Sequence, residues 1–312
     1  MSPLREALRD YLRLRRQLGF ELKRDGRLLE GFVDFLERAG SQHITTELAL
    51  AWARLPQHAH AHRWRQRLGM VRGFARYLAT IDPSSEVPAE DLLPAARQRM
   101  APYIYSEHEI TALMTAAREL APPLRAATFE TMIGLMAIAG LRLGEALGLD
   151  RRDVDLDDGA LFVRAAKQSK QREVPLHPTT TEALREYARL RDRCWSKPKT
   201  PAFFVSTQGR QLSSHAVYRT FPNLIRQAGL EGAGQRTRPR PHDLRHAFAV
   251  RTLLGWHRAG EEVEGKLPLL STYLGHAHPG STYWYMQAVP ELLQLVGSGR
   301  WERCYEPDRA NA

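Results

Sequence analysis

The hydrophobic residues of this chain repeat every three or four positions over most of its length, and they alternate in one region, between residues 154 and 176. The first pattern is typical of helices with one buried face, and the second of short half-buried strands. Strands are expected at 154–156, 160–164 and 172–176, joined by Asp158-Gly159 and by a polar turn around Gln168-Ser169. The pattern predicts a mainly helical α+β protein with a small antiparallel sheet.

The expected helices form two groups, which we interpret as two domains. They lie at 4–12, 28–36, 48–55 and 63–78, and then at 125–139, 143–149, 179–190, 215–229, 243–254, 267–274 and 281–295. Three prolines and two serines interrupt the pattern at 81–94, and Ser106 with Glu109 has the spacing of a capping box that opens a helix. We therefore expect a helical domain with its linker at 1–100 and a second domain at 101–312.

The charge of the chain favours a polyanionic partner. It has 45 basic and 35 acidic residues, and 39 of the basic ones are arginine, whose planar guanidinium matches phosphate. Nucleic acid is the simplest such partner, although GC-rich codon usage is an alternative source of arginine. The longest apolar run, 132–141, is too short to span a membrane, and the charged N-terminus is no signal peptide. Two widely spaced cysteines indicate reducing cytosol, so we expect a cytoplasmic, nucleoid-associated protein.

Four short segments of the second domain carry the chemistry. In order, they are GLRLGEALGL with Arg142, KQSKQREVPL in the predicted hairpin turn, HDLRHAFAV with His242 and Arg245, and YLGHAHPGSTYWYM with His276 and Tyr285. His242 and Arg245 are three residues apart and lie on one face of the predicted helix. Tyr285 follows His276 by nine residues.

These segments, in this order, resemble the tyrosine recombinases, also called the phage integrase family. The resemblance covers residues 106–286 and implies a helical core-binding domain, which binds DNA, followed by a mixed catalytic domain. It implies the catalytic set Arg142, Lys167, His242, Arg245, His276 and Tyr285. Within that set the resemblance makes Tyr285 the nucleophile and Lys167 the proton donor to the departing 5′-oxygen, with the two histidines positioning the phosphate or exchanging protons.

The implied reaction suits these residue types. A tyrosine phenolate can form a 3′-phosphotyrosyl link and later be displaced, and two guanidiniums can stabilise the charge of the transition state without a metal. The link stores the energy of the broken bond, so we expect no ATP or other cofactor. Lys170 is an alternative to Lys167, and Tyr283 to Tyr285, although the two tyrosines point in nearly opposite directions on a helix. We interpret Glu145 as a structural partner of Arg142.

His246 and His278 are interpreted as packing or surface residues and are left out of the site. His58, His60 and His62 alternate without acidic or cysteine companions, so we expect no metal site there.

Two clusters of arginines are expected to contact DNA. One is on the helix at 63–78 and the other leads to His242; their members are Arg63, Arg65, Arg67, Arg72 and Arg76, and Arg236, Arg238 and Arg240. For the first cluster a solvated helix face is the alternative.

The sequence thus predicts a site-specific recombinase or integrase that acts on double-stranded DNA at a specific site. We expect a homotetramer on paired sites, alone or with other recombinases. The segment 255–272 is expected to be an inserted loop and, with GSTYWYMQAVPELL, resembles members carried by transposon-like mobile elements. A catalytically inactive DNA-binding accessory protein and a type IB topoisomerase are the alternatives.

Overall fold

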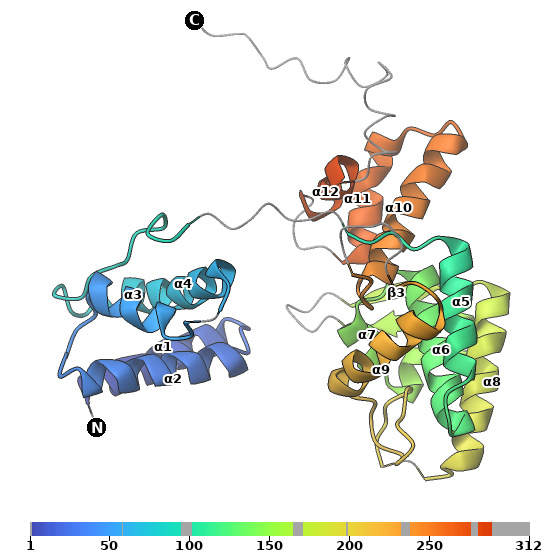
Figure 1. Ribbon diagram of the computed structural model, residues 1–312, viewed down its shortest axis with the longest axis horizontal. Coiled ribbons are helices and arrows are strands. Elements are labelled where there is room, and N and C mark those ends of the chain that lie inside the picture. The colour runs from blue at the N-terminus through green and yellow to red at the C-terminus, as the bar shows by residue number, and fades with distance from the viewer. Residues whose placement is uncertain are drawn as a thin grey trace, which may run out of the picture. The chain divides into compact units, whose positions relative to one another are not determined.

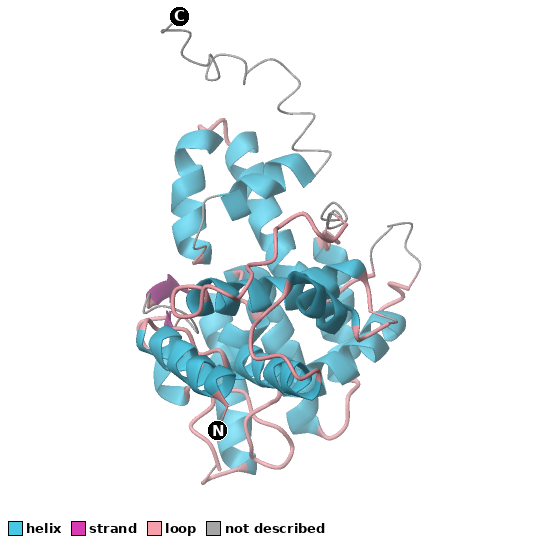
Figure 2. Ribbon diagram, turned by 90° about the vertical axis from the view of Figure 1, so that its left-hand side faces the viewer, coloured by secondary structure: helices cyan, strands magenta, loops and turns pink. Residues whose placement is uncertain are grey.

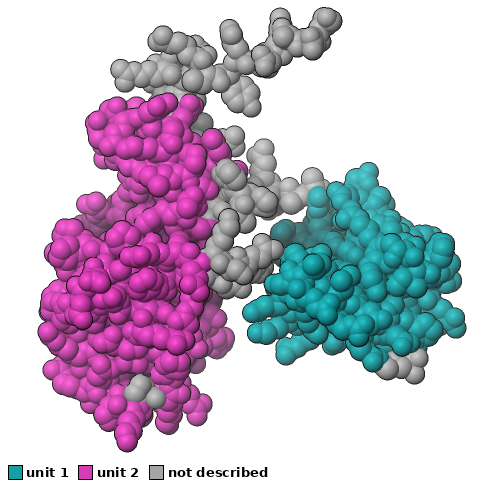
Figure 3. All heavy atoms as spheres, turned by 180° about the vertical axis from the view of Figure 1, so that it is seen from behind, with its two compact units in different colours: residues 1–99 teal, residues 100–312 magenta. Residues whose placement is uncertain are grey.

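The computed structural model describes residues 2–57, 59–94, 102–164, 171–197, 199–231, 238–275 and 280–288. The chain divides into two compact units, residues 1–99 and 100–312 (Figure 3). Unit 1 is built around one hydrophobic core, and unit 2 around two. Each unit is described by itself.

Unit 1 is built from helices. They are α1 (Pro3–Gln17), α2 (Lys23–Arg38), α3 (Thr46–Arg54) and α4 (Ala61–Leu78). The side chains of Ser2 and Thr45 accept backbone N–H groups at the starts of α1 and α3, which satisfies donors that a helix leaves unpaired. Phe32, Val33 and Phe74 are fully buried where the apolar faces of these helices meet. The expected helical character of this part of the chain is confirmed.

Unit 2 is organised around one buried helix, α6. Its helices are α5 (Glu107–Arg118), α6 (Pro123–Ala139), α7 (Leu143–Leu147), α8 (Pro178–Cys194), α9 (Ser214–Gln227), α10 (Asp243–Arg258), α11 (Val263–Leu274) and α12 (Gly280–Ala288). α6 is apolar on nearly every side, and it packs against α5, α8 and α10 (Figure 1). The predicted capping box is present, since Ser106 and Glu109 each bind the other's backbone N–H at the start of α5.

The sheet is the predicted antiparallel meander. Its strands β1 (Val154–Asp155), β2 (Ala160–Val163) and β3 (Arg172–Pro175) pair in chain order, after a 3₁₀ turn at Arg151–Asp153. Gly159 has a φ of +67° in the first turn, as expected from the Asp-Gly pair. Elsewhere in the described ranges the elements are helices (Figure 2), and none of those helices is long and apolar enough to cross a membrane.

The expectation of an inserted loop at 255–272 is wrong. α10 continues to Arg258 and α11 begins at Val263, so the connection is short. A glycine inside a helix costs only about 1 kcal/mol relative to alanine. Packing outweighs that cost here, because Leu253, Val263 and Leu267 are buried in one cluster with Tyr285. The helix expected at 281–295 is α12 as far as Ala288, and its remainder lies outside the described residues.

Candidate active site

Two glycine-terminated helices position the Arg245 side chain. Gly140 follows α6 and Gly275 follows α11, and both have a positive φ, +60° and +64°, which suits glycine. The guanidinium of Arg245 donates to the carbonyl of Gly140 at 2.8 Å and to that of Leu274 at 2.6 Å. Carbonyls at helix C-termini lack partners within the helix and favour a cation. Arg245 is therefore held rigidly, and only 1% of it is exposed.

Arg142 also donates to a carbonyl at the end of α11, but it remains partly accessible. Its Nη2 donates to the Gly275 carbonyl at 2.8 Å, and its Nη1 donates to Glu145 Oε1 at 2.6 Å. The side chain is 38% exposed. Arg142 is thus the member of the arginine pair that solvent, or a bound phosphate, reaches first.

Glu145 joins three arginines. Arg172, the first residue of β3, donates to both of its carboxylate oxygens at 3.1 and 2.7 Å, and Arg245 Nη1 lies 3.8 Å from Oε2. Burial alone would raise the pKa of this carboxyl, but hydrogen bonds from the Arg172 side chain and the Arg142 backbone lower it to about 2. Glu145 is therefore ionised at neutral pH and is a structural partner, as the sequence predicted, but of three arginines instead of one.

The site has an excess of positive charge. Burial and the nearby Arg142 lower the pKa of Arg245 to about 10, which still leaves it protonated at neutral pH. Arg142, Arg172 and Arg245 together carry two more positive charges than Glu145 neutralises. An anion that binds between Arg142 and Arg245 would relieve their mutual repulsion. This arrangement suits a phosphate.

Tyr285 is buried next to this cluster. It is 2% exposed, and a negative charge on its oxygen would raise the pKa of the nearby Arg245. Its hydroxyl lies 2.7 Å from Nδ1 of His246 on α10. Tyr283, the alternative nucleophile, is 49% exposed and points away from that core.

The structure brings four of the predicted site residues into one region. Arg142 and Arg245 are both close to Glu145. The ring centroids of His242 and His246 are 4.7 Å apart, and His246 in turn contacts the Tyr285 hydroxyl. Lys167 and His276 lie outside the described residues, as do the alternative Lys170 and the excluded His278.

Two residues of this region were missed in the sequence, and each had a signal. His246 is four residues after His242 on one helix, which places both on the same face. Arg172 is two residues before the buried Val174 in β3, so both side chains point to the same side of the sheet. His246 is buried, as a packing residue would be, and it lies on the part of α10 that also carries Arg245.

The arginines of α4 differ in what they contact. Arg67 stacks on the Trp52 ring at 3.6 Å and donates to the Trp52 carbonyl. Arg65 donates to the carbonyl of Pro94, and Arg72 donates to those of Pro88 and Ala89. These three arginines therefore have contacts within unit 1.

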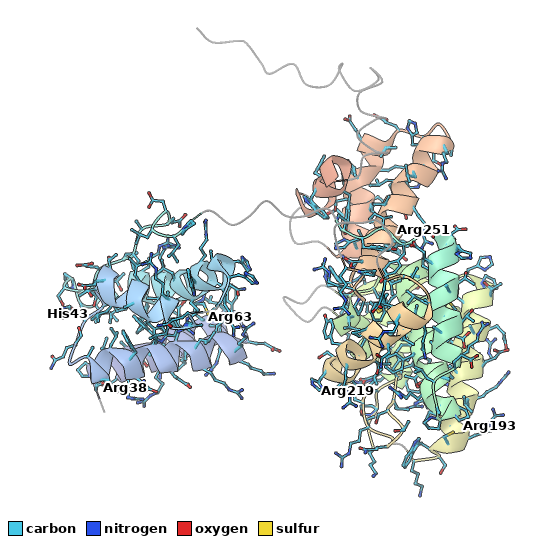
Figure 4. The ribbon with its side chains drawn as sticks, in the orientation of Figure 1. Arg38, His43, Arg63, Arg193, Arg219 and Arg251 are labelled. Atoms are coloured by element: carbon cyan, nitrogen blue, oxygen red, sulfur yellow. The ribbon has the colours of Figure 1, made fainter. Side chains whose placement is uncertain are left out.

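The other two α4 arginines are exposed. Arg76 pairs with Glu90 at the surface, and Arg63, in the first turn of α4, is exposed (Figure 4). In the second cluster Arg240 pairs with the buried Asp243, Arg238 is exposed, and Arg236 lies outside the described residues. The described residues contain no cluster of ligands that would hold a metal ion, and His58 is not among them.

Known proteins resemble the chain over nearly its whole length. The model of the phage integrase family matches residues 104–291. A Sinorhizobium fredii protein named as an integrase/recombinase, y4rB, is 44% identical over 98% of this chain and 99% of its own length. Tyrosine recombinase XerC of Azotobacter vinelandii is 33% identical over 78% of this chain and 76% of its own. The solved integrase of transposon Tn1549, in complex with transposon right end DNA, has a similar fold, with a TM-score of 0.65, 14% identity and coverage of 96% of this chain and 100% of that one.

Proposed function

The chain belongs to the phage integrase family of tyrosine recombinases, and we propose that it cleaves and rejoins DNA at a specific site through a 3′-phosphotyrosyl link to Tyr285. The arrangement of Arg142 and Arg245 beside this tyrosine carries the proposal. Both guanidiniums are fixed on backbone carbonyls at helix ends, so they need no rearrangement of their own to clamp one phosphate.

Cleavage begins when the Tyr285 oxygen attacks the scissile phosphorus. Negative charge then grows on the two nonbridging oxygens, and the excess positive charge of the arginine cluster stabilises it. Arg142 is accessible in the free chain, whereas Arg245 and Tyr285 are buried. We therefore expect DNA to contact Arg142 first and a small displacement of α12 to admit the phosphate.

The departing 5′-oxygen needs a proton, and we assign its donation to Lys167, which lies between β2 and β3 in the sequence. His242 and His276 position the phosphate or exchange protons. Because the phosphotyrosyl bond retains the energy of the broken phosphodiester, another 5′-hydroxyl can attack it and reseal the DNA. The cycle requires no ATP or other cofactor.

We propose double-stranded DNA as the partner, with exposed arginines of both units contacting phosphates. Strand exchange joins four DNA ends, so we expect four copies of the chain on two paired sites. We also propose that the chain acts for a mobile element, and its fold, which is similar to that of the Tn1549 integrase, is compatible with that role.

Covalent trapping tests the proposal. The binding site is first selected from a pool of random duplexes, and a nicked duplex carrying it is then incubated with the full chain. We expect a protein–DNA adduct on a denaturing gel, formed equally well with excess EDTA because arginines supply the phosphate clamp. Tyr285→Phe should lose the adduct and keep DNA binding, while the matched control Tyr283→Phe should retain both. An adduct lost only in Tyr283→Phe, or only when metal is removed, would overturn the mechanism.

A further inference from the structure

His246 holds the hydroxyl of the proposed nucleophile. The Nδ1–Oη distance of 2.7 Å is that of a full hydrogen bond, and both side chains are almost completely buried, at 4% and 2% exposed. The His246 ring also meets those of His242, Trp284 and Tyr285 edge-on or tilted. The pair is therefore fixed from both α10 and α12.

A phenol must lose its proton as it attacks phosphorus. Phenols ordinarily ionise near pH 10, so at neutral pH a base that is already in contact gives a large advantage. The neighbouring arginines have no acceptor atom. The nearby carboxylate, Glu145, is a poor base because its pKa is about 2 and its oxygens already bind Arg142 and Arg172. Histidine has both an acceptor nitrogen and a suitable ordinary pKa.

We propose that His246 is the general base for Tyr285, an inference that rests on the proposed function. In cleavage the Tyr285 O–H bond breaks, its proton passes to Nδ1 of His246, and the phenolic oxygen bonds to phosphorus. The P–O5′ bond breaks, and the 5′-oxygen takes a proton from the separate acid, Lys167. In resealing, a 5′-hydroxyl attacks phosphorus and its proton passes back to Lys167. The Tyr285–phosphorus bond breaks, and the departing phenolate takes its proton back from His246.

The assignment explains why α10 carries this pattern of side chains. Arg245 and His246 are adjacent, and His242 is one turn before them. One rigid helix thus presents the arginine that clamps the phosphate and the base that activates its attacker. Protonated His246 would lie close to Arg245, and the negative charge that develops on the phosphate in the same step offsets their repulsion.

Variants of His246 test the inference on the same selected, nicked duplex. His246→Phe keeps the ring shape, and His246→Asn keeps a polar atom near the position of Nδ1; neither can take up a proton. We expect both to form the adduct at least 100-fold more slowly than the wild type and to bind DNA with unchanged affinity. His257→Phe, the same change in the last turn of α10, should react at the wild-type rate.

A duplex with sulfur in place of the bridging 5′-oxygen distinguishes protonation of the leaving group from deprotonation of Tyr285, because a thiolate leaves without a proton donor. We expect this duplex to restore cleavage by Lys167→Ala and to leave His246→Phe and His246→Asn defective.

Three results would overturn the inference while an active wild type upholds the proposed function. In the first, His246→Phe cleaves at the wild-type rate. In the second, His246→Asn cleaves at the wild-type rate, which would make His246 only a hydrogen-bond partner of Tyr285. In the third, the sulfur duplex restores cleavage by His246→Asn. Failure of the wild type itself to form an adduct would instead overturn the proposed function.

Discussion

Glu145 is the residue that allows three arginines to stay close together. Its carboxylate accepts hydrogen bonds from Arg142 and Arg172 and lies 3.8 Å from Arg245, and all four groups are wholly or partly shielded from water. Without it, like charges would push the two phosphate-binding guanidiniums apart. The sequence indicated the partnership with Arg142 from the three-residue spacing. The link to Arg172 depends on β3 folding back beside α7, which no local spacing encodes.

Removal of the Glu145 charge should destabilise unit 2 in a pH-dependent way. The folded carboxyl has a pKa of about 2, below its ordinary 4.5, so its stabilisation is present above pH 4.5 and is lost as the pH falls toward 2. We expect Glu145→Gln to lower the free energy of unfolding by about 3 kcal/mol at pH 7. Urea unfolding at several pH values measures this.

The difference in the free energy of unfolding between the wild type and Glu145→Gln should become smaller as the pH approaches 2. The control is Glu130→Gln, which removes a surface ion pair with Arg118 and should cost under about 1 kcal/mol. A difference that is the same at pH 7 and pH 3 would contradict the assigned role of Glu145.

At the scale of elements, the site is built where α6 and α11 end. Local signals in the sequence located these ends, because Gly140 and Gly275 each follow an apolar helical run. Local signals also identified the strands, because hydrophobic residues repeat every two positions in a strand and every three or four in a helix. The short turn between α10 and α11 was missed because Gly255 and Gly265 resemble loop residues until the packing of Leu253 and Leu267 is known.

A methyl group at Gly140 should disturb both the helix end and the site. Its φ is +60°, and a Cβ there would lie 2.5 Å from the Phe248 ring. Gly229 has a φ of +70° with nothing within 4 Å of its Cβ position, so Gly229→Ala is a matched control for backbone strain alone. We expect the control to lower the free energy of unfolding by about 1 kcal/mol, and we expect Gly140→Ala to lower it by more.

Because the Gly140 carbonyl binds Arg245, Gly140→Ala should also slow adduct formation, whereas Gly229→Ala should not. Thermal unfolding and the trapping assay measure the two effects. Equal effects of both substitutions would show that the Gly140 region does not position Arg245.

At the scale of the whole molecule, the arginines that the sequence grouped together have different surroundings. Composition shows that arginine is abundant, but it does not distinguish a side chain that stacks on Trp52 from one that faces water. Arg67 is of the first kind, and Arg63 is of the second. The distinction arises from tertiary packing and therefore required the structure.

The dependence of DNA binding on salt should follow that distinction. For every phosphate that a substitution releases from the protein, the slope of log affinity against log salt becomes shallower by about 0.9. We expect the double substitution Arg63→Ala with Arg76→Ala to reduce the slope, and Arg67→Ala to leave it unchanged while lowering the melting temperature. Fluorescence anisotropy at several salt concentrations measures the slope; the reverse pattern would make Arg67 the residue that binds DNA.

The C-terminal segment offers a test of assembly. Leu292, Leu293, Leu295 and Val296 are too apolar to favour water, and we expect the segment to pack against a neighbouring copy on DNA. A chain truncated before Pro290 should bind one half-site and fail to form the complex on paired sites, as measured by mass photometry. If the truncated chain assembles as readily as the full chain, the segment packs on its own unit.

The central claim is that Tyr285 forms the covalent link to DNA. Tandem mass spectrometry of the trapped adduct, after digestion of protein and DNA, identifies the residue that carries the nucleotide. We expect a 3′-phosphonucleotide on Tyr285 in the peptide that also contains Tyr283, formed with EDTA present. A nucleotide on Tyr283 or any other residue, or a cleaved duplex with no protein attached, would contradict this claim.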